Sequence, residues 1–503
     1  THTHTHTHTQ HILSRHRNGR ECKNGVYAIL HVFEKWMVEC ENKIVSDQHE
    51  RWQKINKRHK GRELDEQYFA DVNNLAMKSE RIITEMCTID NKEIPTMVRK
   101  HFVKIQREIM IRVVNRVKFE NVEILTNDFS TLLASTWSKI LLSSKSRMKE
   151  EERQKQLTAF MNLFTFLDDK LEFLNTYKSL LASRLLSPLY NNLEDERKML
   201  QYFKLKVSLS TTTAMEAMLR DAENAKKMND IWISVVKRRK DISPDASALR
   251  VLTVSQSSWP SNVFVSKTAT KLPENVSNWI QMYRKSNDVN HDQLAGARFV
   301  VCKGLGNVLM SLKYGNKIQY RVRMCPSQAS LILLLKREGK LTFTEIQNKL
   351  EIESDQVVAN LLISVLRKPI KKCTGGLVRK ILSKGQKPLP LKGDDKFMLN
   401  IKFRSKNASF VLPKVSDRKR GGHFVEAKRT QDAKLRRRLQ LEFALIRILK
   451  THKELSLKEV IVETTHSVRR YFHADPKEVK RAIEIMQKRK YFEVKDSIVR
   501  YLA

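Results

Sequence analysis

The side-chain types that most often carry chemistry are scattered along this 503-residue sequence. Its six cysteines include no CxxC pair, so their spacing fits neither a zinc site nor a disulfide framework and favours a reducing compartment. No Cys–His or Ser–His–Asp pattern and no glycine-rich phosphate loop stands out. We therefore assign no catalytic residue, no cofactor and no metal ligand to the chain.

One amine nevertheless occupies an unusual position. Lys450 closes the apolar run ALIRILK (444–450), and ideal helical rotation puts it on the face shared by Leu439, Phe443 and Ile446. A lysine in the interior would be costly unless its ammonium reached water. We therefore predict that the helix ends at Lys450, where the amine is exposed and suits the negative end of the helix dipole. The alternative is an ordinary lysine at a helix end.

The charge balance of the chain is strongly basic. Lys and Arg number 94 against 55 Asp and Glu, for a formal charge of +39, which favours acidic partners: nucleic acid, an anionic membrane or acidic protein segments. No apolar run approaches the length of a membrane span, so no span is expected. Of the acidic partners, we expect no membrane. Residues 418–450 hold eleven basic and three acidic side chains, a net charge of +8. They form either a solvated linker and exposed helix face or a surface for an acidic partner.

The elements that position these residues change in type along the chain. The N-terminal THTHTHTHTQH is expected to be a disordered or artificial tail. Residues 20–240 show helical periodicity with few glycines and prolines, which predicts helix after helix, in a bundle or stacked array. From about residue 242, β-branched runs and prolines predict strand-bearing structure. Three short strands are expected in 297–324, with a hairpin turn at KYGNKI (313–318).

The last third of the sequence follows one plan twice. In the first copy a helix from 327 ends at Gly339, Thr342 and Glu345 form a capping box, and Ser354 opens a third helix. The segments GLVRKILSK and KFMLNIKF then read as two strands of a wing.

The second copy repeats the same elements after residue 435. Ser456 and Glu459 have the capping-box spacing, and Asp475, Pro476 and Glu478 open the third helix. YFEVKDSIVRYL then reads as a hairpin, so each copy predicts a winged helix. Such domains bind proteins as well as DNA.

The third helices of the two copies differ in charge. That of the first copy, ESDQVVANLLISVLRK, is acidic at its start and mostly apolar, so it would repel phosphate. The third helix of the second copy carries Lys477, Lys480 and Arg481, and these basic side chains are compatible with DNA binding. A basic winged-helix nucleic-acid-binding protein is therefore the alternative function, although nucleic acid is the less favoured partner.

Several segments, in this order, resemble the cullins, the scaffold subunits of multi-subunit RING ubiquitin ligases. They are FLDDKLEFLNTYKSLLASRLL (166–186), YFKLKVSLSTTTAMEAMLRDAENAKKMN (202–229), RVLTVSQSSWPS (250–261), GDDKFMLNIKFRSK (393–406), ALIRILK and the terminal YLA. The chain departs from the family where HDQLAGARFV (291–300) replaces a stretch with a tryptophan and a basic pair.

The resemblance implies a mostly α fold with a smaller α+β part: elongated helical repeats or a bundle, then a sheet-containing domain and two winged helices. The expected domains are a tail (1–20), a helical region with possible remnants of the family's repeats (21–150), a helical bundle (151–245), a RING-binding α/β domain (246–326), a first winged helix (327–416), a basic linker (417–434) and a C-terminal winged helix (435–503).

The resemblance also implies a function and partners. The chain would be a non-catalytic scaffold in the cytoplasm and nucleus that holds a small RING-box protein and a ubiquitin-loaded E2 near an adaptor or substrate receptor of unknown type. Zinc would belong to the RING partner only. Lys450 would form the isopeptide bond to an activating ubiquitin-like modifier, a reaction called neddylation, with Lys453 as the nearest rival.

Two surfaces follow from the same resemblance. The sheet that receives the RING subunit is expected to include Trp259, Phe299, Val300, Val301, Val308, Leu309 and Met310. An acidic partner, such as the tail of an E2, is expected to bind Lys434, Arg436, Arg437 and Arg438.

Overall fold

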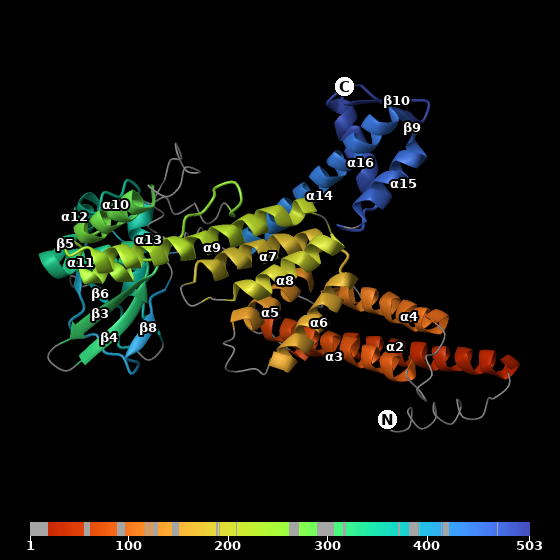
Figure 1. Cartoon of the computed structure of the whole chain (residues 1–503), viewed down its shortest axis with the longest axis horizontal. Coiled ribbons are helices and arrows are strands. Elements are labelled where there is room, and N and C mark those ends of the chain that lie inside the picture. The colour runs from red at the N-terminus through yellow and green to blue at the C-terminus, as the bar shows by residue number, and fades with distance from the viewer. Residues whose placement is uncertain are drawn as a thin grey trace. The chain divides into compact units, whose positions relative to one another are not determined.

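The structure is a computed structural model of the whole chain (Figure 1). It describes residues 19–54, 61–87, 96–115, 118–119, 122–123, 129–142, 150–187, 190, 192–207, 209–260, 271–288, 306–314, 318–370, 373–381, 391, 393–413, 415, 422–469 and 471–502. The chain divides into two compact units. The first comprises Thr1–Leu181, Glu194–Thr212 and Arg429–Ala503, and the second Ala182–Leu193 and Thr213–Lys428.

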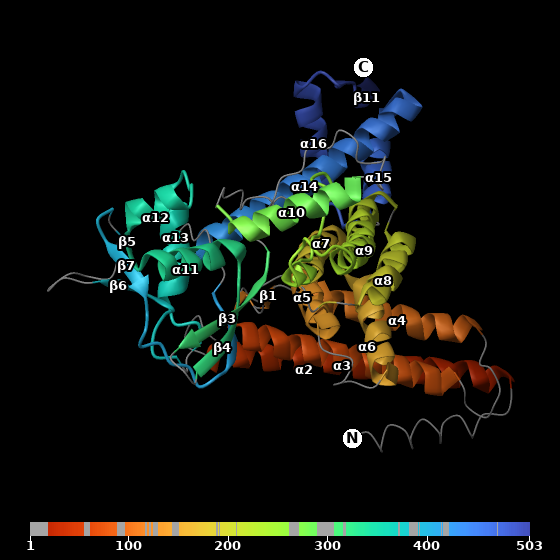
Figure 2. The ribbon, with the colours of Figure 1, turned by 60° about the vertical axis from the view of Figure 1, so that its left-hand side comes forward.

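The first unit begins with helices that the sequence periodicity predicted. They are α2 (Gly19–Lys54), α3 (Gly61–Cys87), α4 (Thr96–Asn115), α5 (Phe129–Leu142), α6 (Glu150–Phe166), α7 (Lys170–Leu185) and α8 (Leu193–Lys206), with a short ladder of β1 (Lys118–Phe119) and β2 (Val122–Glu123) between α4 and α5. Helices α2, α3 and α4 lie side by side (Figures 1 and 2). None of the described helices combines the length and hydropathy needed to cross a bilayer.

Polar and aromatic contacts join these first helices. The carboxylate of Glu41 on α2, only 4% exposed, accepts a 2.8 Å hydrogen bond from Arg112 on α4. The Tyr68 hydroxyl on α3 donates to the carbonyl of Val113 at 2.8 Å. Because both contacts satisfy buried polar groups, they favour one helix arrangement over others with similar apolar burial.

An aromatic cluster holds α6, α7 and α8 together. The rings of Phe164, Phe173 and Phe203 lie 5.0–5.5 Å apart, and Tyr177 stacks on Phe173 at 5.8 Å. The Tyr177 hydroxyl donates to the buried carboxylate of Glu196 on α8. Aromatic pairs of this kind stabilise a fold by more than their buried area alone, so they fix the first turns of α7 against α6 and α8.

The second unit contains helices α9 (Leu209–Arg238) and α10 (Glu274–Asp288), followed by a hairpin and the first winged helix. The later elements are β3 (Val308–Tyr314), β4 (Ile318–Met324), α11 (Pro326–Glu338), β5 (Lys340–Thr342), α12 (Phe343–Lys349), α13 (Asp355–Leu366), β6 (Val378–Ile381), β7 (Lys396–Leu399) and β8 (Ser409–Val411). One sheet has the order β3-β4-β8 and the other β5-β7-β6. The wing strands β6 and β7 pair as predicted.

The hairpin and the first winged helix share one hydrophobic core. It runs from Val322 on β4 through Leu331 on α11 and Leu362 on α13 to Phe397 on β7. The antiparallel pairing of β3 and β4 confirms the predicted hairpin. Its turn residues and the first of the three predicted strands fall outside the described residues.

Most of the local helix signals in the first winged helix are confirmed. Helix α11 ends at Gly339, whose φ of 82° few other residues adopt, and Thr342 and Glu345 form the predicted capping box. Helix α13 begins directly after Ser354, but the Ser354 side chain makes no cap hydrogen bond. The predicted N-cap is therefore right in position and wrong in mechanism.

The C-terminal winged helix belongs to the first unit. It consists of α14 (Gly422–His452), β9 (Glu454–Ser456), α15 (Leu457–Val468), α16 (Pro476–Lys488), β10 (Phe492–Lys495) and β11 (Ile498–Tyr501), with sheet order β10-β11-β9. The capping boxes of Ser456 with Glu459 and of Asp475 with Glu478 are present. The fold is thus mostly helical with a smaller sheet-bearing part and two winged helices, which confirms the predicted class.

Helix α14 differs from the prediction at both ends. It begins at Gly422, inside the stretch 417–434 that the sequence predicts to be a linker, and it ends at His452 rather than at Lys450. The later part of the predicted linker, from Gly422, is therefore helical and continues into the winged helix.

Candidate modification site and partner surfaces

Lys450 lies in the last turn of α14 and its side chain is exposed. Among the described residues, its ammonium has no hydrogen-bond or ion-pair partner. An exposed, unpaired amine next to a helix end is open to reagents and enzymes from solvent. The predicted exposure of Lys450 is therefore confirmed.

The physical reason for that exposure differs from the prediction. The core of the winged helix takes Leu441, Leu445 and Leu449 from α14, while Leu439 is 41% and Phe443 69% exposed. The side of α14 with Leu439, Phe443 and Lys450 therefore points to solvent, whereas Ile446, the third apolar residue predicted on that face, is partly buried against the core. Lys450 is exposed because of the side of the helix on which it lies, and it needs no helix end to reach water.

Lys453, the rival amine, closes the helix instead. Its backbone adopts a φ of 67°, its N–H donates to the carbonyl of Leu449 at 2.8 Å, and its own carbonyl accepts from Tyr501 at 2.9 Å. A residue in the left-handed region just after the last turn, most often glycine, commonly ends a helix. Lys453 thus has a backbone role that Lys450 lacks, although the side chains of both lysines are exposed.

The predicted acidic-partner residues on α14 have internal partners. Arg436 lies 2.5 Å from the carboxylate of Glu172 on α7, and Arg437 lies 3.1 Å from Asp169 and 3.3 Å from Glu478. These arginines connect α14 to the start of α7 and to α16, so an acidic partner would have to displace carboxylates of the chain itself.

Arg437 makes further contacts that fix its position. Its guanidinium donates to the carbonyl of His473 at 2.7 Å and lies 4.4 Å from the centre of the Phe472 ring. The backbone N–H groups of Lys170 and Leu171, at the start of α7, donate to the carbonyl of Tyr471 at 2.9 and 3.3 Å. Through these hydrogen bonds the turn before α16 is docked on the first turn of α7. In that turn, burial of the Lys170 side chain lowers the pKa of its ammonium group.

The other two predicted residues of this set differ from each other. Arg438 pairs with the nearly buried carboxylate of Glu442 one turn along α14, at 3.3 Å, and Arg489 approaches the same carboxylate at 3.2 Å. Lys434 is exposed and has no ion-pair partner among the described residues. Only Lys434 of the four remains fully available to an acidic segment.

Three of the predicted RING-binding residues lie on β3. Leu309 is 64% exposed, and Val308 and Met310, on the other face of the strand, pack against the core. Among the described strands β3 pairs only with β4, so its second side is an edge. Phe299, Val300 and Val301 fall outside the described residues.

Trp259 is not on this sheet. It is only 3% exposed, and its indole N–H donates to the carboxylate of Asp221 on α9 at 2.7 Å. The backbone N–H of Ser255 donates to the same carboxylate at 3.0 Å. These contacts anchor a loop to α9, which is a structural role.

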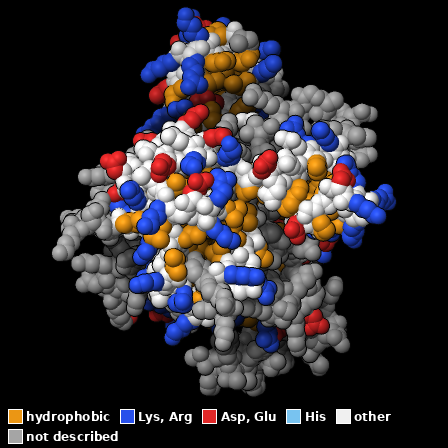
Figure 3. Space-filling model, turned by 90° about the vertical axis from the view of Figure 1, so that its left-hand side faces the viewer, with side chains coloured by type: hydrophobic (Ala, Val, Ile, Leu, Met, Phe, Trp, Pro, Cys, Tyr) orange, Lys and Arg blue, Asp and Glu red, His pale blue; other side chains and the backbone are white. Residues whose placement is uncertain are grey.

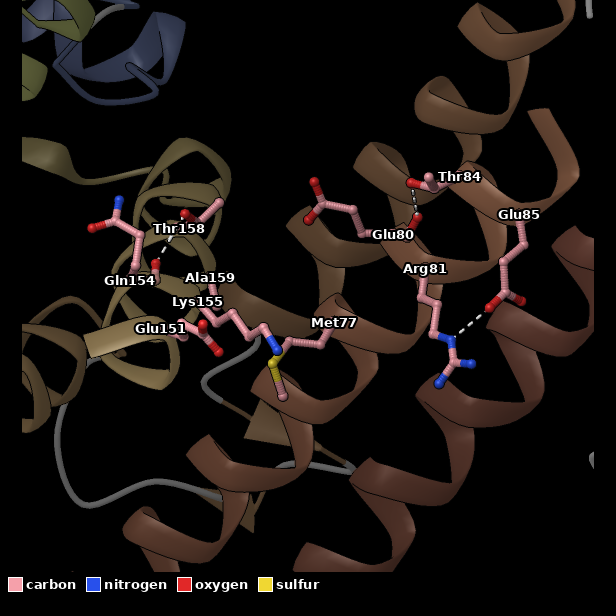
Figure 4. A pocket seen from close by; sticks show the side chains of 10 residues that line it. All are labelled: Met77, Glu80, Arg81, Thr84, Glu85, Glu151, Gln154, Lys155, Thr158 and Ala159. Atoms are coloured by element: carbon pink, nitrogen blue, oxygen red, sulfur yellow. Dashed lines mark hydrogen bonds and ion pairs between the residues drawn. The ribbon is translucent and has the colours of Figure 1, made fainter. Parts of the chain in front are cut away.

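An open groove of about 890 Å³ lies between α3 and α6. Figure 4 shows Arg81 paired with Glu85 along α3, and Glu151 and Lys155 across the groove on α6. Acidic and basic side chains alternate there without converging on one point. Within the part of the chain that the structure describes, no cluster of His, Cys, Asp and Glu could hold a metal ion.

Comparisons with known proteins give the same assignment at both ends of the chain. A family model described as "Cullin alpha solenoid domain" matches residues 13–229, and one described as "Cullin protein neddylation domain" matches 436–497. The second match includes Lys450. The first extends over the region 21–150 that sequence motifs alone left open.

Two curated relatives show the extent of the similarity. Cullin-1 of Oryza sativa subsp. japonica is 27% identical over 380 residues, which cover 74% of this chain and 47% of the relative. Cullin-3B of Arabidopsis thaliana is 24% identical over 369 residues, which cover 70% of this chain and 46% of the relative. The chain spans about half the length of the curated relatives it matches.

A solved structure titled "A Dual E3 Mechanism for Rub1 Ligation to Cdc53: Dcn1(P)-Cdc53(WHB)" is also similar. It is 24% identical, covers 18% of this chain and 100% of that chain, and has a TM-score of 0.15. The two family models and the curated relatives together show that this chain belongs to the cullin family, as a divergent member.

Proposed function

We propose that this chain is a non-catalytic scaffold subunit of a multi-subunit RING ubiquitin ligase, and that Lys450 accepts a ubiquitin-like modifier. The observation that carries the proposal is the exposed, unpaired side chain of Lys450 in the part of the chain that matches the neddylation domain. Lys453 lies in the same match, but its left-handed backbone closes α14.

The chemistry asked of Lys450 is that of a nucleophile. Its neutral amine attacks the carbonyl of a thioester between the modifier's C-terminus and the cysteine of a conjugating enzyme. The C–N bond forms, the C–S bond breaks, and the departing thiolate takes up a proton. Because a lysine in water is protonated at neutral pH, the modifying enzyme has to remove the ammonium proton at the moment of attack.

The rest of the chain contributes position rather than chemistry. The length of a packed helix is fixed by its number of residues, and polar contacts such as that of Glu41 with Arg112 connect α2 to α4. Helices packed in this way suit a rigid spacer. Holding a substrate receptor and a loaded E2 on one body turns their encounter into a nearly intramolecular reaction. In this proposal the ubiquitin transfer itself takes place on the partners.

The RING partner would add a strand to the β3-β4-β8 sheet. Strand addition needs an edge with free main-chain groups, and β3 supplies one among the described strands. The zinc ions of a RING protein would be held by that protein's own ligands. Lys434 remains available to an acidic segment of an E2, whereas Arg436 and Arg437 are already paired.

The test of the acceptor is a reconstituted conjugation reaction. The full chain is incubated with the modifier, its activating and conjugating enzymes and a small RING protein, and the mass of the product is measured. We expect one added modifier in the wild type and in Lys453→Arg, and none in Lys450→Arg. Unchanged modification of the Lys450→Arg variant would remove Lys450 from this role.

The test of the scaffold is recovery of the tagged full chain from a native extract. The proposal requires that a small zinc-bearing RING protein copurify, with zinc measured by atomic absorption. If the chain alone formed a thioester with ubiquitin, it would be an enzyme and the scaffold proposal would fail.

A further inference from the structure

The C-terminal winged helix presents one side of α16 to solvent. Val479, Ala482, Ile483 and Met486 point into the domain core. The opposite side carries Lys477, Lys480, Arg481, Glu484 and Lys488, all exposed. In a helix-turn-helix the corresponding second helix of the motif enters the major groove of DNA, with its N-terminal residues nearest the bases.

The cations of this side are not neutralised within the protein. Among the described residues, Lys477, Lys480 and Arg481 have no carboxylate within ion-pair distance. Several other basic residues of the domain are paired: Arg436 with Glu172, Arg437 with Asp169 and Glu478, Arg489 with Glu442, Lys495 with Glu493 and Arg500 with Glu454. Lys434, Lys450 and Lys458 are, like the α16 cations, exposed and without an ion pair among the described residues, so what distinguishes α16 is that three such cations lie within five residues on one side of a helix.

The acids at the start of α16 are already engaged. Asp475 accepts a 2.8 Å hydrogen bond from the backbone N–H of Lys477, and Glu478 closes the capping box and lies 3.3 Å from Arg437. The charge of Glu478 is therefore balanced by Arg437, whereas Asp475 keeps its negative charge beside Lys477. With Glu484 also counted against Lys477, Lys480, Arg481 and Lys488, this side of α16 retains an excess of positive charge.

Two other surfaces, the wing of the C-terminal winged helix and the third helix of the first winged helix, are less suited to phosphate. The wing between β10 and β11 turns at Asp496, and Lys495 beside it pairs with Glu493. In the first winged helix α13 begins at Asp355 and buries Val358, Leu361 and Leu362. Figure 3 shows the C-terminal winged helix at the top of that view, where Lys and Arg side chains flank an apolar surface.

We infer that the exposed side of α16 binds duplex DNA, through contacts of Lys477, Lys480 and Arg481 with backbone phosphates at the edges of the major groove. The B-form major groove is about 12 Å wide and admits a helix. Phosphate contacts carry little sequence information, so the binding has a weak sequence preference and a steep dependence on salt. This inference does not depend on modification of Lys450.

The test uses the full chain and a fluorescein-labelled DNA duplex of about 20 base pairs, which spans two turns of the groove. Anisotropy titrations are run at several salt concentrations. We expect Lys477→Gln/Lys480→Gln/Arg481→Gln to weaken binding at least about tenfold at the lowest salt. The slope of log K against log salt should flatten by about 0.9 for each phosphate that the variant no longer neutralises.

The matched control removes the same charges from another exposed surface. Lys226→Gln/Lys227→Gln/Arg238→Gln on α9 also replaces two lysines and one arginine, all exposed. We expect the control to bind within about twofold of the wild type. An equal loss of affinity in both variants would show that net charge alone drives binding and would overturn the assignment to α16.

A duplex RNA of the same sequence is the second control. Its major groove is deep and narrow, so α16 cannot enter it. We expect weaker binding to RNA than to DNA. Equal affinity for the two duplexes, or no binding of the wild-type chain to DNA, would overturn the inference. Circular dichroism spectra that match the wild type will show that both triple variants are folded.

Discussion

The guanidinium of Arg437 lies 3.1 Å from the carboxylate of Asp169, although 268 residues separate the two in the sequence. Asp169 also caps α7, because its other oxygen accepts a 2.9 Å hydrogen bond from the backbone N–H of Glu172. One carboxylate therefore starts a helix of the N-terminal region and holds the C-terminal winged helix beside it. Arg436, paired with Glu172, repeats the contact one residue earlier on α14.

Replacing Arg437 by alanine is expected to loosen this docking without unfolding either part. The half-buried side chain loses two ion pairs, a hydrogen bond to His473 and its stacking on Phe472. A hydrogen bond to a charged group contributes about 1.5–3 kcal/mol, so we expect the docked state to lose about 2 kcal/mol.

Hydrogen exchange measures this change directly. The amides of Lys170 and Leu171 donate to Tyr471 across the contact, so their exchange should accelerate in Arg437→Ala. Lys434→Ala, an exposed change three residues earlier on α14, is the matched control and should leave both amides protected. Protection that survives in Arg437→Ala would mean that the backbone contacts alone hold the domain.

The buried face of α14 leads to a second prediction. Leu445 is fully buried in the winged-helix core, so Leu445→Ala should destabilise that domain by about 2–5 kcal/mol. Phe443 is 69% exposed, so Phe443→Ala should change stability by less than about 0.5 kcal/mol. Denaturant unfolding, monitored by spectroscopic signals of the winged helix, measures the free energy of unfolding of both variants. The reverse order of effects would place the Phe443 face in the core.

Local signals predicted the helix starts of both winged helices because the groups that start a helix lie within four residues of one another. Thr342 with Glu345 and Ser456 with Glu459 form capping boxes that the sequence displays directly. The buried side of α14 was harder to predict. Leu439 and Phe443 mark one apolar stripe and Leu441 and Leu445 another, so only the packing of α15 and α16 decides between them.

The site was predictable where it depended on a segment and unpredictable where it depended on distant contacts. The exposure of Lys450 was predicted from a short run of residues, but for the wrong reason, because that run does not show that the Leu439 and Phe443 side of α14 points to solvent. The partners of Arg437 did not, because nothing in a stretch of basic residues indicates which carboxylates lie next to it in space. Trp259 shows the same limit: its bond to Asp221 on α9 joins segments 38 residues apart and makes it structural.

A buried ion pair in the first winged helix gives a third prediction. Lys380 on β6 and Asp395 before β7 lie 2.6 Å apart with side chains only 4% and 2% exposed. Asp395→Ala leaves the Lys380 charge buried without its partner, and the loss of stability should be about 3–5 kcal/mol.

The double variant Lys380→Met/Asp395→Leu separates charge from packing. It removes both charges and keeps apolar volume, so we expect it to recover most of the stability that Asp395→Ala forfeits. Thermal unfolding of the three proteins makes the comparison. A double variant as unstable as the single one would show that Asp395 stabilises the wing through hydrogen bonds or packing rather than through its charge.

The capping box of α15 should make stability depend on pH. The side-chain hydroxyl of Ser456 donates to the carboxylate of Glu459 at 2.7 Å and the Ser456 backbone N–H at 3.1 Å, and these bonds lower the pKa of Glu459. A lowered folded-state pKa means that the ionised carboxylate stabilises the native state above its unfolded pKa of about 4.3. That contribution is lost as the pH falls through the lower pKa of the folded state.

Glu459→Gln keeps an acceptor oxygen but cannot titrate, so the wild type should be the more stable at pH 7 and the difference should shrink between about pH 4.5 and pH 3. Unfolding of the winged helix measured at pH 7, 5, 4 and 3 tests this, with Glu484→Gln as a control that removes an exposed carboxylate outside any cap. A difference between wild type and Glu459→Gln that is constant over the whole range would mean that the charge of Glu459 makes no contribution to the cap.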